Sequence, residues 1–183
     1  MRWDALFADL EAQINGEAAR DRVVEVQEMV RIERAQLPIS GRLGGHLGGP
    51  VALVLLGGLR LRGQLRRVGA GWLSLTVGNV EYLVPVPAVA SLTGPGARVA
   101  PPANPGRRLV SLGAALRAVV RDRARVTLHA RDGSILGTGT LDHAGIDYVQ
   151  LAAHPLGEFR RDDSVRALLL VPLEALAAVQ RDA

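Results

Sequence analysis

The chain contains no cysteine and no lysine, and only 3% of its 183 residues are aromatic. Without cysteine, disulfide bridges, thiolate metal sites and thiol nucleophiles are excluded, and a reducing compartment fits. A core must be built from valine, leucine, isoleucine and alanine, which the apolar content of 48% allows. No apolar run is long enough for a membrane span, and the first residues carry carboxylates, unlike a signal peptide. We therefore expect a soluble cytoplasmic protein.

Every one of the 22 basic residues is arginine, which a GC-rich genome favours, so part of the formal charge of +4 carries no information. The distribution of charge is more informative. Residues 1–38 have five Arg and eight acidic residues (net −3), residues 39–99 have six Arg and one Glu (net +5), and residues 100–183 have eleven Arg and nine acidic residues (net +2). Any anion-binding surface is therefore expected in residues 39–99.

The N-terminal part of the chain is predicted to be helical. Asp4 is a suitable N-cap, and apolar residues at helical spacing predict a helix over Ala5–Ile14. A second helical pattern runs from Glu17 to Gln36 and is ended by Pro38. Its narrow apolar stripe is typical either of a helix that packs on its own domain or of a dimer seam.

One pattern occurs twice in the chain. VALVLLGGLRLRGQLRRVGAGWLSL (Val51–Leu75) and VTLHARDGSILGTGTLDHAGIDYVQL (Val126–Leu151) both begin with Val-x-Leu and end in glycine, an aromatic residue and leucine. Two later segments also correspond, VPVPAVASL (Val84–Leu92) and VPLEALAAV (Val171–Val179). The two matched ends indicate an internal duplication.

The first copy is predicted to form five short strands. Leu59–Arg66 has the clearest two-residue period in the chain, with leucines on one face and arginines on the other, and Gly63 in its middle permits a sharp bend. Leu43 and Leu47 allow a short, weak helix within Ser40–Pro50. The other strands are expected at Val51–Leu56, Trp72–Val77, Val80–Val84 and Val89–Leu92.

The second copy is predicted to follow a helix whose apolar stripe begins at Leu109 and ends at Val119. Asp132-Gly133 is expected to form its first turn. One extra residue around Gly137–Gly139 indicates a bulge. His154–Ser164 is expected to form a longer polar loop, here called the polar excursion, between the third and fourth strands of this copy.

The first copy carries the pattern Val-x-Leu-x-Leu-x-x-Gly-x-x-x-x-Gly-x-Leu, formed by Val51, Leu53, Leu55, Gly58, Gly63 and Leu65. Together with the closing segments, this pattern resembles the Sm/LSm-like small β-barrel family, in two tandem divergent copies. The fold expected from the resemblance is mainly β with helices: two tandem Sm-like (SH3-like) five-stranded small barrels, each preceded by a helix. The expected divisions are an N-terminal helical segment (1–37), a first barrel (38–96), a Pro/Gly linker (97–106) and a second barrel with its leading helix (107–180).

The resemblance also implies partners. Sm-like proteins pair the fourth strand of one barrel with the fifth strand of its neighbour, form rings, and in many cases bind RNA at the pore. The expected partners are therefore RNA or another nucleic acid, and further copies of the chain or an internal pseudo-dimer. The Asp and Asn that contact RNA in the family do not carry over, because their positions hold Gly69 and Leu73 in the first copy and Gly145 and Val149 in the second.

The candidate binding residues lie on the first copy. Arg60, Arg62 and Arg66, with Arg67 beside them, are suited to contact phosphates, and Trp72 is suited to stack on a base. The alternatives are that the arginines form only a solvated strand face and that Trp72 belongs to the core. A further set of arginines either extends the basic surface or forms a solvated helix end that is partly paired through Asp122: Arg117, Arg121, Arg123 and Arg125.

No pattern predicts catalysis, a metal or a cofactor. The four histidines lack metal-ligand spacing, no nucleophile motif surrounds Asp142-His143, and Gly41–Gly49 lacks the Lys-Ser/Thr ending of a phosphate loop. The sequence therefore predicts a non-catalytic module with two alternative functions. One is nucleic-acid binding through the arginine row, and the other is protein interaction or assembly through the N-terminal helix and the barrel edges.

Overall fold

The computed structural model describes residues 27–29, 31–32, 38–94, 109–155 and 165–182. The chain separates into two units, Met1–Pro38 and Ile39–Ala183. In the first unit, residues 27–29 and 31–32 are helical. The remainder of the two predicted N-terminal helices lies outside the described residues, as do the predicted linker and most of the polar excursion. Within the described residues, no helix is both long enough and apolar enough to cross a membrane.

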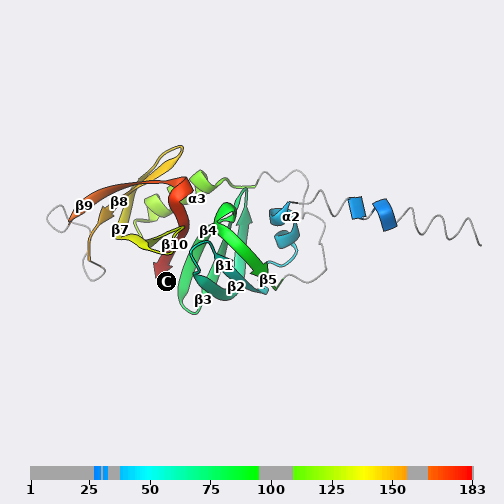
Figure 1. The fold of residues 1–183 in the computed structure, drawn as a ribbon. Coiled ribbons are helices and arrows are strands. Elements are labelled where there is room, and N and C mark those ends of the chain that lie inside the picture. Colours follow the sequence, from blue (N-terminus) through cyan, green and yellow to red (C-terminus); the bar gives the residue numbers. More distant parts are fainter. Residues whose placement is uncertain (1–26, 30, 33–37, 95–108, 156–164, 183) are drawn as a thin grey trace, which may run out of the picture. The chain divides into compact units, whose positions relative to one another are not determined.

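The second unit is mainly β, because ten strands form one antiparallel sheet in the order β5-β1-β2-β3-β4-β10-β6-β7-β8-β9 (Figure 1). The first half of the sheet contains β1 (Pro50–Leu55), β2 (Arg60–Gly69), β3 (Trp72–Val77), β4 (Val80–Pro85) and β5 (Val89–Thr93). The second half contains β6 (Arg125–Ala130), β7 (Ile135–Ala144), β8 (Tyr148–Ala153), β9 (Ala167–Pro172) and β10 (Leu176–Asp182). The predicted strands are all present, and β3 has the predicted bounds.

Short helices precede and interrupt each half. The weak helix expected near Leu43 is α2 (Ile39–Gly44), and its Leu43 is buried. The helix before the second half, α3 (Leu112–Asp122), begins three residues later than its apolar stripe suggests, because the hydroxyl of Ser111 accepts a hydrogen bond from the amide of Ala114 and caps the helix there. Between the fourth and fifth strands of each half lies a 3-10 turn, η1 (Val86–Ala88) or η2 (Leu173–Ala175).

The internal duplication is visible in the irregularities of the sheet as well as in its strands. The second strand of each half has a bulge at the same place, with register shifts between Leu65 and Arg67 and between Leu141 and His143. The extra residue of the second copy is Leu136, which has no partner where the β6–β7 register shifts. The predicted bulge is therefore present, one residue before Gly137.

The two halves are not closed into barrels, so the expectation of two tandem five-stranded barrels is met only in its strands. The pairing of a fourth strand with a fifth strand, which the resemblance implies, is present within the chain. The fourth strand of the first half, β4, pairs with β10 and not with its own β5, so the two halves share one continuous sheet. Four pairs define this junction: Leu83 with Val179, Tyr82 with Gln180, Glu81 with Arg181, and Val80 with Asp182. Strand edges expose unpaired N–H and C=O groups, and this junction satisfies those of both halves at once.

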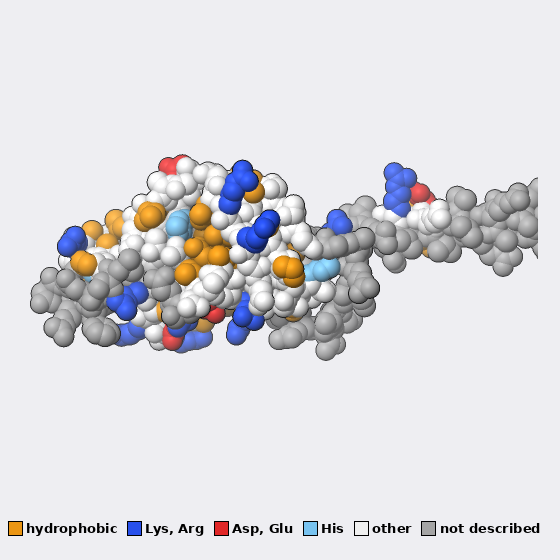
Figure 2. All heavy atoms as spheres, turned by 90° about the horizontal axis from the view of Figure 1, so that it is seen from below, with side chains coloured by type: hydrophobic (Ala, Val, Ile, Leu, Met, Phe, Trp, Pro, Cys, Tyr) orange, Lys and Arg blue, Asp and Glu red, His pale blue; other side chains and the backbone are white. Residues whose placement is uncertain are grey.

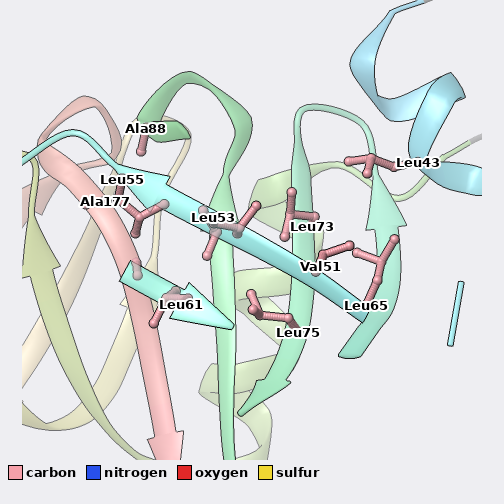
Figure 3. Close-up of a cluster of buried hydrophobic side chains, with 12 residues drawn as sticks. Leu43, Val51, Leu53, Leu55, Leu61, Leu65, Leu73, Leu75, Ala88 and Ala177 are labelled. Atoms are coloured by element: carbon pink, nitrogen blue, oxygen red, sulfur yellow. The ribbon is translucent and has the colours of Figure 1, made fainter. Parts of the chain in front are cut away.

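Each half has its own core of leucine, valine and alanine, and the two cores exchange residues across the junction. Ala177 and Ala178 of β10 are fully buried in the core of the first half, and Figure 3 shows Ala177 beside Leu55 and Ala88. Conversely, Leu83 of β4 packs against the core of the second half. The β4–β10 junction is therefore held by apolar packing as well as by backbone pairing.

Glycine in the second strand of each half allows the neighbouring strand to approach closely. A Cβ at Gly63 would collide with the carbonyl oxygen of Thr76 on β3, and a Cβ at Gly139 would collide with that of Ala152 on β8. A side chain is therefore excluded by close backbone contact at both positions.

The turn between the first two strands differs between the halves. Gly57 and Gly58 have φ of +84° and +89°, whereas the second half has the predicted Asp132-Gly133, with φ of +92° at Gly133. The hydroxyl and amide of Ser134 both donate hydrogen bonds to the Asp132 carboxylate, at 2.6 and 2.9 Å, and lower its pKa. Asp132 stands at the position of Gly57, so an Asx turn takes the place of the first glycine of the turn, while the second glycine is kept as Gly133.

Candidate functional site

The outer face of β2 brings together the four arginines predicted from the sequence. Arg60, Arg62, Arg66 and Arg67, here called the arginine surface, are all exposed, whereas Leu61 and Leu65 of the same strand are buried. Strand geometry explains this, since alternate side chains point to opposite faces. The predicted orientation of the arginine side chains is confirmed.

The bulge in β2 changes the spacing of these arginines. Leu65 pairs with Leu75 and Arg67 pairs with Ser74, so Arg66 has no partner in the register. An extra residue in one strand of a pair shifts the alternation of side chains beyond it. As a result, two consecutive arginines lie on the outer face.

Small or neutral residues surround the arginine surface. On β1, Val54 pairs with Arg60 and Ala52 pairs with Arg62; on β3, Ser74 pairs with Arg67. Side chains this short leave the guanidinium groups accessible from the solvent side. Figure 2 shows one face of the molecule, on which arginine side chains are exposed at several places and acidic side chains are few.

Within the part of the chain that the structure describes, none of the four guanidinium groups forms an ion pair. The Nε of Arg66 donates a hydrogen bond to the hydroxyl of Thr76, at 3.0 Å, which orients that side chain along β3. Its other guanidinium nitrogens keep their donor capacity. The arrangement offers forked N–H donors to an anion without first breaking a salt bridge.

Trp72 does not belong to this surface. It is only 6% exposed, and its indole N–H donates a hydrogen bond to the carbonyl oxygen of Val110, at 2.8 Å. The ring also lies over Gly69, where any Cβ would collide with it. Trp72 therefore connects β3 to the segment before α3. Of the two alternatives, base stacking and a place in the core, these contacts favour the core. Its ring is not available as a stacking platform.

The second half has no counterpart of the arginine surface. Thr138, Thr140 and Asp142 occupy the positions of Arg62, Gln64 and Arg66. Thr140 is buried, and its hydroxyl is hydrogen-bonded to Nε2 of His154 at 2.9 Å. A hollow of about 270 Å³ lies nearby, lined by Val120, Arg123, Thr140, Leu141 and Asp142.

The arginines of the second half are placed differently from the expectation. Asp122 forms its ion pair with Arg181 of β10, at 2.9 Å, and not with the arginines around the end of α3. Both side chains are about half exposed, so this pair contributes little to stability. The pair places charged residues at the β4–β10 junction, since Arg181 is also the register partner of Glu81 on β4.

Among the described residues, no three histidine or acidic side chains gather in a way that could hold a metal ion. Of the predicted site residues, the structure thus brings four arginines together on β2 and separates Trp72 from them.

No protein-family model matches this chain, and no curated protein matches it in sequence.

Proposed function

We propose that the chain binds nucleic acid, RNA in particular, through the arginine surface of β2. The observation that carries the proposal is that four exposed guanidinium groups lie on one strand face without an ion pair to any described residue. Phosphate contacts by arginine release counterions from the nucleic acid, which supplies most of the affinity in sequence-independent binding. The buried position of Trp72 favours backbone contacts over base stacking.

The proposal extends to the architecture. We propose that the two halves of the sheet are divergent Sm-like units, opened and joined within one chain. The repeated strand order, the 3-10 turn before each fifth strand and the pairing of β4 with β10 support this assignment. The surfaces have diverged while the cores have not, because the arginines of β2 are replaced by threonine and aspartate in β7.

Changing Arg60, Arg62 and Arg66 together to glutamate is expected to weaken the binding of a labelled single-stranded RNA by at least about tenfold at low salt. The physical reason is that each lost phosphate contact removes counterion release, about 0.7 in the slope of log K against log salt for a single strand. Three lost contacts should therefore flatten the slope by about 2. Fluorescence anisotropy at several salt concentrations measures both quantities.

The matched control changes three other exposed arginines, Arg117, Arg121 and Arg166, to glutamate. It produces the same change in net charge away from β2. We expect its affinity to fall less than threefold and its salt slope to change by less than about 1. Unaltered binding in the β2 variant would refute the proposal, and so would an equal loss in both variants, because binding would then follow net charge alone.

A further inference from the structure

The β2–β3 turn of the first half binds a segment of the same chain, Leu109–Ser111, here called the docked segment. The carbonyl oxygen of Val110 accepts two hydrogen bonds there, from the amide of Ala70 at 2.9 Å and from the indole N–H of Trp72 at 2.8 Å. Ser111, which has an extended backbone, also forms a parallel β-bridge with Ala70. Because the Val110 side chain stays 54% exposed, the docked segment is held mainly through its backbone.

The β7–β8 turn of the second half has the same frame. Gly145–Tyr148 corresponds to Gly69–Trp72, since each runs from a glycine to the aromatic residue of its copy. In both turns the aromatic ring lies over that glycine, where a Cβ would collide with the ring. The carbonyl of the third residue, Gly71 or Asp147, accepts a hydrogen bond from the first amide of the following 3-10 turn, at 2.8 or 2.7 Å. The first turn can therefore serve as a template for the second.

The β7–β8 turn presents two donors that have no acceptor. Ile146 and Tyr148 stand where the first turn has the residues that donate to Val110. Within the part of the chain that the structure describes, neither the Ile146 amide nor the Tyr148 hydroxyl forms a hydrogen bond. The Cζ of Tyr148, which carries the hydroxyl, lies on the ring edge that covers Gly145. A carbonyl oxygen placed like that of Val110 would give both donors an acceptor.

Two replacements in this turn indicate what kind of segment it suits. Ile146 replaces Ala70, so an apolar side chain that is 94% exposed stands beside the donors. Asp147 replaces Gly71, and its exposed carboxylate has no ion-pair partner among the described residues. Gly71 has φ of +77° and Asp147 has no positive φ, a change that reorients the peptide after Ile146 and not its amide. An apolar side chain and a carboxylate suit an apolar, basic peptide better than a polyanion.

We propose that the β7–β8 turn is a docking site for an extended peptide segment of a partner protein. A backbone carbonyl of that segment accepts hydrogen bonds from the Ile146 amide and the Tyr148 hydroxyl, as Val110 does at the first turn. An apolar side chain of the segment covers Ile146, and a basic residue lies near Asp147. Main-chain hydrogen bonds supply the affinity and the two side-chain contacts supply the selectivity. The arginine surface takes no part in this contact.

The chain's own docked segment supplies the probe for a test. Arg107 and Arg108 precede it in the sequence, so the peptide GRRLVSL (residues 106–112) combines basic residues with apolar residues around the carbonyl that the first turn binds. In the full chain the first turn already holds the docked segment, so only the second turn is vacant for the peptide. The docked segment of a second copy is engaged in the same way, which favours a partner protein over self-association.

The test titrates this peptide, acetylated and amidated, into the isotopically labelled full chain, followed by heteronuclear NMR. Saturable shifts are expected for the amides of Ile146, Asp147 and Tyr148, with a Kd of about 1 mM or tighter. The amide of Ala70 is expected to stay unchanged, because its acceptor is already in place. A peptide with glutamate in place of both arginines is expected to bind at least about threefold more weakly at low salt.

Three variants separate the donors from the side chains. Ile146→Pro is expected to lose saturable binding, because proline has no N–H, although it suits the second position of a turn. Ile146→Ala keeps the N–H and restores the residue of the first turn, so the affinity is expected to fall less than about fivefold. Tyr148→Phe loses one donor and is expected to bind about fivefold more weakly. Circular dichroism checks that each variant folds.

Several results would overturn the proposal. One is the absence of saturable shifts at the β7–β8 turn, and another is equal binding by Ile146→Pro and the wild-type chain. Shifts of Ala70 in place of Ile146 would mean that the peptide displaces the docked segment. Shifts of Ile146 with protein concentration alone would assign the turn to a second copy. The affinity for single-stranded RNA is expected to be the same in Ile146→Pro, and a tenfold loss would assign the turn to nucleic acid instead.

Discussion

Replacing Gly139 by alanine is expected to lower the free energy of unfolding by about 2–3 kcal/mol or more. The added Cβ would collide with the carbonyl oxygen of Ala152, which belongs to the neighbouring strand β8. Ala152 is completely buried and pairs with Thr140 in the β7–β8 register, so its backbone cannot move without disturbing that pairing. Urea denaturation followed by circular dichroism measures the loss.

Gly113→Ala is the matched control for this substitution. Gly113 lies in α3, and a Cβ there meets only the end of the flexible Arg117 side chain, at 3.4 Å. Alanine also has the higher helix propensity, so stability is expected to stay the same or to rise by up to about 1 kcal/mol. A neutral Gly139→Ala would show that β7 and β8 can separate locally, and that the close approach is not essential to the fold.

Replacing Ala177 by aspartate is expected to cost at least about 3 kcal/mol of stability. Ala177 is 1% exposed and lies in the apolar core of the first half, although its strand pairs with β6 of the second half. A carboxylate there loses its hydration in an apolar core. Because one residue supports both halves, we expect thermal unfolding to shift to lower temperature in a single transition.

Ala90→Asp tests the same change at the equivalent position of β5. Ala90 is exposed, so the folded chain is expected to keep its stability within about 0.5 kcal/mol. Differential scanning calorimetry compares the unfolding of the two variants. Two separate transitions in Ala177→Asp, or equal effects of the two substitutions, would contradict the view that the β4–β10 junction couples the halves.

The arginine surface was largely predictable from the sequence, because the alternation in Leu59–Arg66 assigns arginine and leucine to opposite faces. The bulge at Arg66 was not predicted there, since it depends on how β2 aligns with β3. The role of Trp72 was also outside the reach of local pattern. Its hydrogen-bond acceptor, the carbonyl oxygen of Val110, is 38 residues away along the chain.

The pairing of charges shows the same limit. Asp122 lies beside Arg121 and Arg123 in sequence, which suggested a local pairing at the helix end. In the structure its ion pair goes to Arg181, which the β4–β10 and β6–β10 pairings bring to that place. Proximity along the chain was a poor guide because the sheet decides which side chains meet.

The sequence by itself determined the positions of the strands, their buried faces, the duplicated turns and the concentration of arginine on the first copy. These features depend on residues a few positions apart, since side chains alternate every two residues and glycine and proline act locally. The resemblance implied that a fourth strand pairs with a fifth, but only the tertiary structure decided that this pairing occurs inside one chain, through β4 and β10, so that the halves form one sheet. Pairing at a strand edge is made by backbone N–H and C=O groups, which every residue type except proline carries alike, so no local pattern specifies which edge a strand will choose.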